Sequence, residues 1–395
     1  MDYQQAALEA VGLLERLIAT PSVSRDEKVA ADIIENYLRL KGAEPHRDGN
    51  NVWVLSPDFD DARPTVLLNA HIDTVKPAAG WQRDPFTPTL EGDRLYGLGS
   101  NDCGGGLVSL MQIFLMKNEE CRMKNEKTEM KNEECRMKNM GNSHSSFTSE
   151  ASIPHSSFFI LHSSFNFVYL ASCEEEVSGK NGMEHVLPLL PHIDFAIVGE
   201  PTCMQPAIAE KGLMVIDAVA YGKSGHAARN EGVNAIDIAM QDILKLNSEW
   251  QTNRLFPKTS DWLGAVKTTV TIINAGSQHN VIPDRCTYTI DVRPNECYTN
   301  EEVLAILRAN LKSELTPRST RLSSSHIALD HPIVQRCVAL GLKPFGSPTL
   351  SDQALMPFPS LKLGPGDSAR SHTADEFICI SEIEKAIGLY NEILK

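Results

Sequence analysis

Short apolar runs alternate with stretches of helical periodicity through the first 210 residues. Three runs have the composition of buried strands: TVLLNAHIDTV at 65–75, FNFVYLASCEEE at 165–176 and IDFAIVGEPT at 193–202. GGLVSLMQIFL at 105–115 and the N-terminal twenty residues instead place apolar residues at helical spacing. This alternation predicts an α/β domain with a mainly parallel sheet. Functional residues are expected where the strands end, because ligands of such sheets bind at the carboxyl ends of the strands.

From about Lys211 the pattern changes to longer alternating strands. These are MVIDAVAYG, KTTVTIINAG and CTYTIDVRP, and they are accompanied by the helix-period stretches NAIDIAMQDILKLNSEW and NEEVLAILRANLKSEL. Two helices on one antiparallel sheet form a compact α+β domain. After about Asp330 the pattern returns to helix and loop. We therefore expect a first domain made of 1–210 and 323–395, with an α+β domain inserted at 211–322.

The segment 117–165 fits no packed element because it is repetitive and compositionally biased. KNEEC occurs twice in it and HSSF three times. Codons for Asn-Glu-Glu, read on the opposite strand, encode the core of His-Ser-Ser-Phe, so we hypothesise that a DNA element with inverted arms entered the gene and is translated. We expect a disordered, dispensable loop. Its His144, His155 and His162 are not expected to bind metal, since they lack companion carboxylates.

The net charge of −14 argues against nucleic acid or an anionic membrane as a partner, because both attract clustered Lys and Arg. No stretch is long and apolar enough to span a bilayer, and the N-terminus does not have the pattern of a signal peptide. The nine cysteines are odd in number and form no CxxC pair, which favours a reducing compartment. We expect a soluble protein of the cytoplasm.

Metal-binding residue types gather at the ends of the expected strands and in a glycine-rich loop. Imidazoles and carboxylates are ligands that borderline divalent metals accept, and two metals can share a carboxylate. The SCEEE run directly follows a buried strand, so its acids are not all ordinary surface charges. Each group alone has a structural explanation, such as a core histidine or a turn, but their joint occurrence indicates a metal site. The candidates are His71 and Asp73 in HIDT, Asp102 in GSNDCGGG, Glu174–Glu176, Glu200 in VGEPT and His372 in RSHTADEF.

Motifs of a known family run through nearly the whole chain outside 117–165. They are TPSVSRDE, NAHIDTV, YGLGSNDCGGG, the EEE run, VGEPT, GKSGHAARNEGVNAI, HNVIPD, DVRP and GPGDSARSHTADEF. With these motifs the chain resembles the M20 metallopeptidases, and within them the acetylornithine deacetylase and succinyl-diaminopimelate desuccinylase group. The resemblance implies a zinc hydrolase whose inserted domain serves as a lid and dimerisation domain. It also implies a homodimer with two Zn²⁺ ions per site, for which Co²⁺ or Mn²⁺ can substitute.

The resemblance assigns roles to the candidate residues. Asp73 would orient His71, as a carboxylate beside a metal-binding imidazole does. The implied ligands are His71 and Glu200 for one zinc, Glu176 and His372 for the other, and Asp102 as the bridge between them.

The implied general base is Glu175. The family has two adjacent glutamates, and counting back from the following Asn-Gly places them at Glu175 and Glu176. Three consecutive acids leave a shift by one residue open, so Glu174 remains an alternative. The base would take a proton from the attacking water and pass it to the leaving amine. Cys103, beside Asp102, is interpreted as a packing residue although a thiolate is a good zinc ligand.

Three further residues belong to the inserted domain. The resemblance implies that His226 in GKSGHAAR donates to the oxyanion in the active site of a partner subunit. Arg293 in DVRP and Asn280 in HNVIPD resemble residues that contact substrate, and an Arg suits a carboxylate because its planar fork gives bidentate hydrogen bonds. Strand-end capping is the alternative role for Arg293 and Asn280.

The resemblance indicates an N-acyl-L-amino-acid deacylase, with N-acetyl-L-ornithine in arginine biosynthesis as the first candidate substrate. Desuccinylation of N-succinyl-ornithine or N-succinyl-diaminopimelate is the first alternative. A dipeptidase or carboxypeptidase of the same family is the second, and an inactive metal-binding homologue is the third. Retention of the implied ligands and of Glu175 argues against the inactive homologue.

Overall fold

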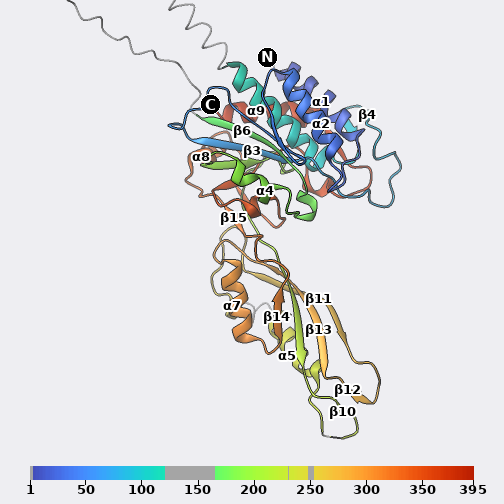
Figure 1. The fold of residues 1–395 in the computed structure, drawn as a ribbon. Coiled ribbons are helices and arrows are strands. Elements are labelled where there is room, and N and C mark those ends of the chain that lie inside the picture. The colour runs from blue at the N-terminus through green and yellow to red at the C-terminus, as the bar shows by residue number, and fades with distance from the viewer. Residues whose placement is uncertain (1–2, 121–164, 230, 248–252) are drawn as a thin grey trace, which may run out of the picture. The chain divides into compact units, whose positions relative to one another are not determined.

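The computed structural model describes residues 3–120, 165–229, 231–247 and 253–395 (Figure 1). Most of the segment 117–165, with the loop expected there and its three histidines, lies outside these residues. The chain divides into two compact units. The first contains Met1–Glu176, Leu190–Phe195 and Pro365–Lys395, and the second contains Val177–Leu189 and Ala196–Gly364.

A mixed sheet forms the centre of the first unit. Its strand order is β1 (His46–Asp48), β2 (Asn51–Leu55), β6 (Asn166–Ser172) and β3 (Thr65–His71). β3 and β6 are parallel, with His71 opposite Ser172. All residues of both strands are buried, as continuous apolar runs predict. This register brings the residues that follow His71 and the acids that follow Ser172 to the same edge of the sheet.

Helices and a small second sheet complete the first unit. The helices are α1 (Tyr3–Ile18), α2 (Lys28–Leu40), α9 (Ile380–Ile393) and the helical residues 105–120. α1 buries one apolar face and packs against α9. The small sheet has the order β18 (Phe377–Cys379), β5 (Arg94–Tyr96) and β4 (Thr89–Glu91). Short turns at Ser100–Gly104, Glu175–Val177 and Ser368–Arg370 carry or adjoin candidate residues.

The second unit begins with strands of the same α/β type. β7 (Phe195–Val198), β17 (Ser360–Lys362), β8 (Ala207–Glu210) and β15 (Ser325–His326) are neighbours in that order, and β16 (Phe345–Ser347) also pairs with β8. The β7–β17 and β16–β8 pairs are parallel. Helices α4 (Met183–Val186) and α8 (Pro332–Ala339) and turns at Leu187–Leu189 and Asp352–Leu355 accompany them.

An α+β part of the second unit contains the elements expected at 211–322. Its antiparallel sheet has the order β11 (Lys267–Ala275), β13 (Arg285–Arg293), β9 (Met214–Tyr221) and β14 (Glu314–Pro317). Helices α5 (Ala235–Asn247) and α7 (Asn300–Asn310) belong to it, and β10 (Gly225–His226) and β12 (Val281–Ile282) form a two-stranded ribbon.

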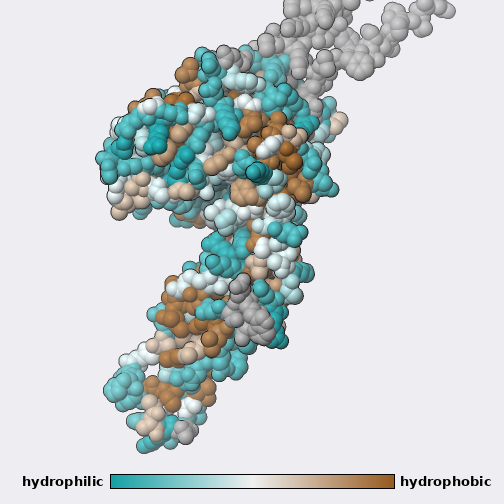
Figure 2. Space-filling view, turned by 180° about the vertical axis from the view of Figure 1, so that it is seen from behind, coloured by the Kyte–Doolittle hydropathy of each residue, from teal (hydrophilic) through white to brown (hydrophobic). Residues whose placement is uncertain are grey.

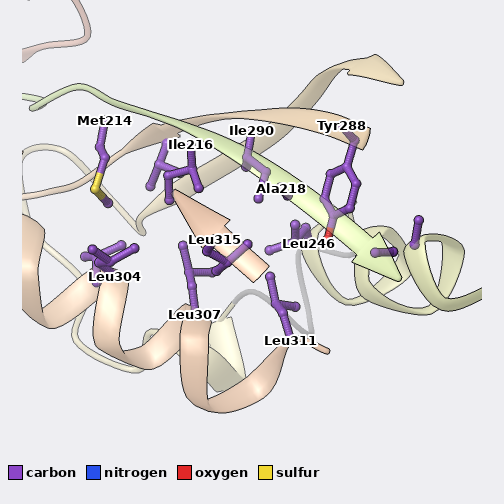
Figure 3. Packing of buried hydrophobic residues seen from close by; sticks show 14 of the residues in the cluster. Met214, Ile216, Ala218, Leu246, Tyr288, Ile290, Leu304, Leu307, Leu311 and Leu315 are labelled. Atoms are coloured by element: carbon purple, nitrogen blue, oxygen red, sulfur yellow. The ribbon is translucent and has the colours of Figure 1, made fainter. Parts of the chain in front are cut away.

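The core of this α+β part follows from the alternation of its strands. Along β9 every second residue is buried. Figure 3 shows Ile216, Ile290 and Leu315 of the sheet pointing toward Leu304 and Leu307 of α7. A capping box fixes the start of α7, since the Thr299 side chain accepts from the Glu302 N–H and the Glu302 side chain accepts from the Thr299 N–H.

Apolar side chains are also exposed on this α+β part. Met240 and Leu244 on α5 and Ile272 and Ile273 on β11 are each at least half exposed, and Figure 2 shows apolar atoms at the surface there. Among the described residues, the structure contains no helix with the length and apolar content that crossing a membrane requires.

Candidate metal and catalytic site

His71 is the last residue of β3 and its imidazole is buried. Its Nδ1 lies 2.9 Å from the backbone oxygen of Asp73 and 3.6 Å from Oδ1 of the same residue. Its Nε2 lies 3.2 Å from Oδ1 of Asp102. Burial disfavours the charged ring, but the electrostatic influence of the neighbouring Cys103 and the bonds to Asp102 and Asp73 outweigh burial and raise the pKa of His71.

Asp102 presents its two oxygens to two different histidines. Oδ1 faces His71, and Oδ2 lies 3.6 Å from Nε2 of His372. Glycine is required in the turn that carries Asp102: Gly99 has a φ of 75°, and a Cβ at Gly104 would lie 2.3 Å from the oxygen of Gly99. The turn therefore aims one carboxylate between two imidazoles.

The acid run after β6 is held through its backbone by two buried carboxylates. Asp73 accepts the N–H groups of Glu175 and Glu176, both at 3.1 Å. Glu27 accepts the N–H of Glu174 at 3.2 Å. Burial opposes ionisation of Asp73, yet its contacts with His71 and other donors keep its pKa below the usual value.

The three acids of the run differ in their surroundings. Glu174 is buried and has a φ of 57°. An oxygen of Glu175 lies 4.0 Å from Nε2 of His71. The oxygens of Glu176 lie 3.0 and 3.2 Å from Nε2 of His372. The hydrogen bond to Glu176, more than any other interaction, raises the pKa of His372 to about 9.

The remaining predicted residues belong to the second unit. Glu200 follows β7 and is partly buried. His226 ends β10 and Asn280 directly precedes β12 of the same ribbon, where the Ala227 N–H donates to the backbone oxygen of Asn280 at 3.0 Å. His226 is exposed. Arg293, at the end of β13, donates to both oxygens of Asp291, from Nε at 2.8 Å and Nη2 at 3.1 Å.

Three residues near the site have contacts that the sequence reasoning did not assign. Glu27 belongs to the TPSVSRDE motif, and Glu376 follows His372 by four positions. Glu376 is buried beside the Asp102 turn, and burial raises its pKa to about 7 although bonds from backbone N–H groups favour the charged form. Cys103 is buried as the packing interpretation requires, but its sulfur also lies within 4.8 Å of a ring nitrogen of His71.

The donor atoms of the first unit fit a divalent metal ion. One ligand atom each from His71, Asp102 and Glu176 lies within 4.8 Å of the others. Imidazole nitrogen and carboxylate oxygen suit zinc, cobalt and manganese. His372 adds a second imidazole on the other side of Asp102. This arrangement can hold cations and can place a carboxylate as proton acceptor next to them.

Two family models match parts of the chain. Residues 67–126 match the model described as peptidase family M20/M25/M40, which includes the segments of His71 and Asp102. Residues 208–318 match the model described as the peptidase dimerisation domain, which includes most of the α+β part.

Curated relatives and solved structures resemble the chain over almost its whole length. The acetylornithine deacetylase of Proteus mirabilis is 26% identical over 415 residues, covering 98% of this chain and 96% of the relative. That of Klebsiella pneumoniae is also 26% identical, covering 97% and 96%.

Among solved structures, an aminopeptidase PepT from Bacillus cereus has a TM-score of 0.70 at 16% identity, covering 98% of both chains. A dinuclear metal-binding peptidase of the M20 family from Bacillus subtilis has a TM-score of 0.66 at 14% identity, covering 99% of this chain and 98% of the other. These likenesses confirm the predicted α/β fold with a mainly parallel central sheet and an inserted α+β dimerisation domain.

Proposed function

Because two parts of the chain match M20 peptidase models and acetylornithine deacetylases resemble it over almost its whole length, we propose that it is an M20 hydrolase that cleaves the amide bond of a small N-acyl-L-amino acid. N-acetyl-L-ornithine, an intermediate of arginine biosynthesis, is the substrate we place first. The observation that carries the proposal is the position of Asp102, whose two oxygens face His71 and His372. A carboxylate between two imidazoles is the arrangement a bridging ligand of two metal ions requires.

We assign the ligands as the sequence motifs suggest. His71 and Glu200 would hold one ion, Glu176 and His372 the second, and Asp102 both. The contact of 3.0 Å between Glu176 and His372 and that of 3.2 Å between His71 and Asp102 support this division. We take zinc as the ion, and cobalt or manganese as substitutes, because imidazole and carboxylate ligands discriminate weakly among them. When bound, such ions polarise a carbonyl and lower the pKa of a water.

The chemistry of the protein side chains centres on Glu175. Its carboxylate lies 4.0 Å from His71 and is partly exposed, so water can reach it. Glu175 would accept the proton of the attacking water and deliver it to the leaving amine. Asp73 supports both roles, because it orients His71 and holds the backbone of Glu175 and Glu176.

Three residues of the second unit have proposed roles toward the substrate or toward a partner subunit. We propose that Arg293 and Asn280 contact the substrate and that His226 of one subunit donates to the oxyanion in the site of its partner. The bidentate contact with Asp291 uses the Nε–Nη2 edge of Arg293 and orients its guanidinium plane, so a substrate carboxylate would meet the Nη1–Nη2 edge. The match to a dimerisation domain supports a homodimer. Because of the cysteine pattern, we propose that the protein acts in the cytoplasm. Because of the net charge of −14, we propose that it has no nucleic acid or membrane partner.

The test is release of free amine from N-acetyl-ornithine, N-succinyl-ornithine, N-succinyl-diaminopimelate and a dipeptide. We expect turnover of N-acetyl-ornithine, its loss with a chelator and its return with zinc. If the protein prefers a succinylated substrate or the dipeptide, that compound replaces N-acetyl-ornithine as the proposed substrate. Absence of turnover on all four, with metal bound, would favour an inactive homologue.

The role of His226 across subunits has its own test. Homodimers of Glu175→Gln and of His226→Ala are each expected to be nearly inactive. Mixing them with subunit exchange forms heterodimers, in which one site has both Glu175 from one chain and His226 from the other. Partial recovery of activity supports the role, while no recovery with exchange demonstrated would contradict it.

A further inference from the structure

Glu376 accepts three backbone hydrogen bonds from the turn that carries Asp102. Its Oε1 accepts the N–H groups of Asn101 and Asp102, both at 2.9 Å, and its Oε2 accepts that of Gly99 at 3.3 Å. The residue is 2% exposed, so these bonds do not compete with bulk water. More than 270 positions of sequence lie between the donors and the acceptor.

The backbone fixes where this carboxylate lies. Glu376 directly precedes β18, which pairs with β5 so that Phe377 is opposite Tyr96. The next residue pair continues the contact, because the Gly97 N–H donates to the backbone oxygen of Glu376 at 3.0 Å. The Glu376 side chain is therefore anchored at the point where the chain leaves β5 and enters the Asp102 turn.

A second connection joins this turn to the loop of His372. The Asn101 side-chain NH₂ donates to the backbone oxygen of Asp367 at 3.0 Å and to the Ser371 hydroxyl at 3.3 Å. The side-chain oxygen of Asn101 accepts the Asp367 N–H at 3.1 Å. Ser371 is adjacent to His372, and Glu376 lies four positions after it. The two loops that carry Asp102 and His372 thus form one hydrogen-bonded assembly.

We propose that Glu376 is a positioning residue that holds Asp102 in its orientation between His71 and His372. The inference rests on the proposed function, because it takes Asp102 as the ligand shared by two ions. An orientation fixed by three backbone bonds keeps one oxygen toward each imidazole before any ion arrives. Partners that orient metal ligands typically contribute 10–100-fold, in order of magnitude, to metal affinity.

A carboxylate suits this position better than an amide. Both oxygens of Glu376 accept, and the three groups they face are N–H donors. Glutamine has one oxygen and one NH₂ group, so Glu376→Gln places a donor against a donor and loses at least one bond while keeping the size of the side chain. Glu376→Asp keeps the charge but is one methylene shorter.

The experiment is titration of the metal-free dimer with Co²⁺, following the visible absorption of the bound ion, whose shape reports its coordination. For Glu376→Gln we expect roughly 10–100-fold weaker cobalt binding than wild type and an altered spectrum. Glu376→Asp is also expected to weaken cobalt binding and to alter the spectrum. It serves as the test if the Gln variant does not fold.

Asp242→Asn is the matched control. Asp242 is also a fully buried carboxylate that accepts backbone N–H bonds, from Lys312 and Ser313, but it lies in the α+β part of the other unit. We expect this variant to unfold at lower temperature with unchanged cobalt affinity and spectrum, which separates a general loss of stability from a loss of positioning.

Two results would overturn the proposal. Wild-type cobalt affinity and spectrum in folded Glu376→Gln or Glu376→Asp would show that Asp102 needs no such support, with the proposed function untouched. Absence of cobalt binding by wild type would remove the metal assignment itself, and the positioning role with it.

Discussion

Nε2 of His372 lies 3.0 Å from a carboxylate oxygen of Glu176, although 196 positions separate the two residues in the chain. His372 comes from a loop near the C-terminus, with a φ of 60°, and Glu176 from the turn after β6. Tertiary structure alone brings them together. Such a pair of imidazole and carboxylate offers two of the ligands that one zinc ion needs.

Removing either member of this pair is expected to remove one of two bound ions. For His372→Ala and Glu176→Gln we predict that metal content after zinc loading and gel filtration falls from two ions per chain toward one. Glu174→Gln is the control, since Glu174 is bonded through its backbone to Glu27. Two ions per chain in both variants would contradict the ligand assignment.

Metal content is predicted to distinguish the general base from the metal ligands. Glu175→Gln should keep both ions and lower kcat by roughly 10²–10⁴-fold, the range of general acid–base contributions. The measurement is kcat and metal content on the same preparation. If instead Glu174→Gln lowers kcat with both ions kept while Glu175→Gln loses an ion, the register of the acid run is shifted by one.

The sequence predicts those parts of the site that follow strands. The runs at 65–75 and 165–176 identify two buried strands, and parallel pairing then brings the residues after His71 and the acid run to one edge. Twenty-six per cent identity to relatives of nearly equal length is consistent with motifs spread along the chain.

The residues that hold these candidate ligands in place could not be predicted in the same way. Glu27 and Glu376 act on backbone N–H groups, which every residue carries, so no pairing of side-chain types reveals them. Asp291 is different: residues two apart share a face of a strand, so its pairing with Arg293 could have been anticipated. That residues 196–210 and 323–364 belong to the same compact unit as the α+β part depends on packing that no local pattern reports.

The exposed edge of the α+β part leads to a prediction about assembly. In the described part of the chain β11 pairs with β13 on one side, and beyond Val270 it exposes Ile272 and Ile273. An apolar edge strand readily pairs with another chain. Ile273→Lys is expected to shift the proposed homodimer toward monomer in sedimentation, whereas Leu40→Lys, at a more exposed position on α2, should not. Equal effects would argue against this edge as the interface.

His331 is expected to make the stability of α8 sensitive to acid. Its Nδ1 accepts the Ile333 N–H as the helix N-cap, which requires the neutral tautomer, and burial lowers its pKa below 6.5. The neutral ring is therefore favoured by folding, so this stabilisation is present above pH 6.5 and is lost as pH falls through the lower, folded pKa.

The matched variant for this effect is His331→Asn, which can cap without titrating. Thermal unfolding measured between pH 7 and 5, expressed as a difference from wild type, should show the variant gaining relative stability as pH falls. Parallel curves for the two proteins would refute the assignment.

Lys362 and Glu210 form an ion pair on the adjacent strands β17 and β8, with both side chains at most 2% exposed and their charged atoms 3.0 Å apart. Lys362→Met leaves a buried carboxylate without its cation and is expected to cost about 3–5 kcal/mol. Adding Glu210→Leu should recover much of this, because a buried pair replaced by apolar groups is often neutral. Arg318→Met, at the exposed pair with Asp217, is expected to cost less than about 1 kcal/mol in the same urea unfolding series. Similar costs for the two single variants would mean that burial of the Lys362–Glu210 pair does not control its contribution to stability.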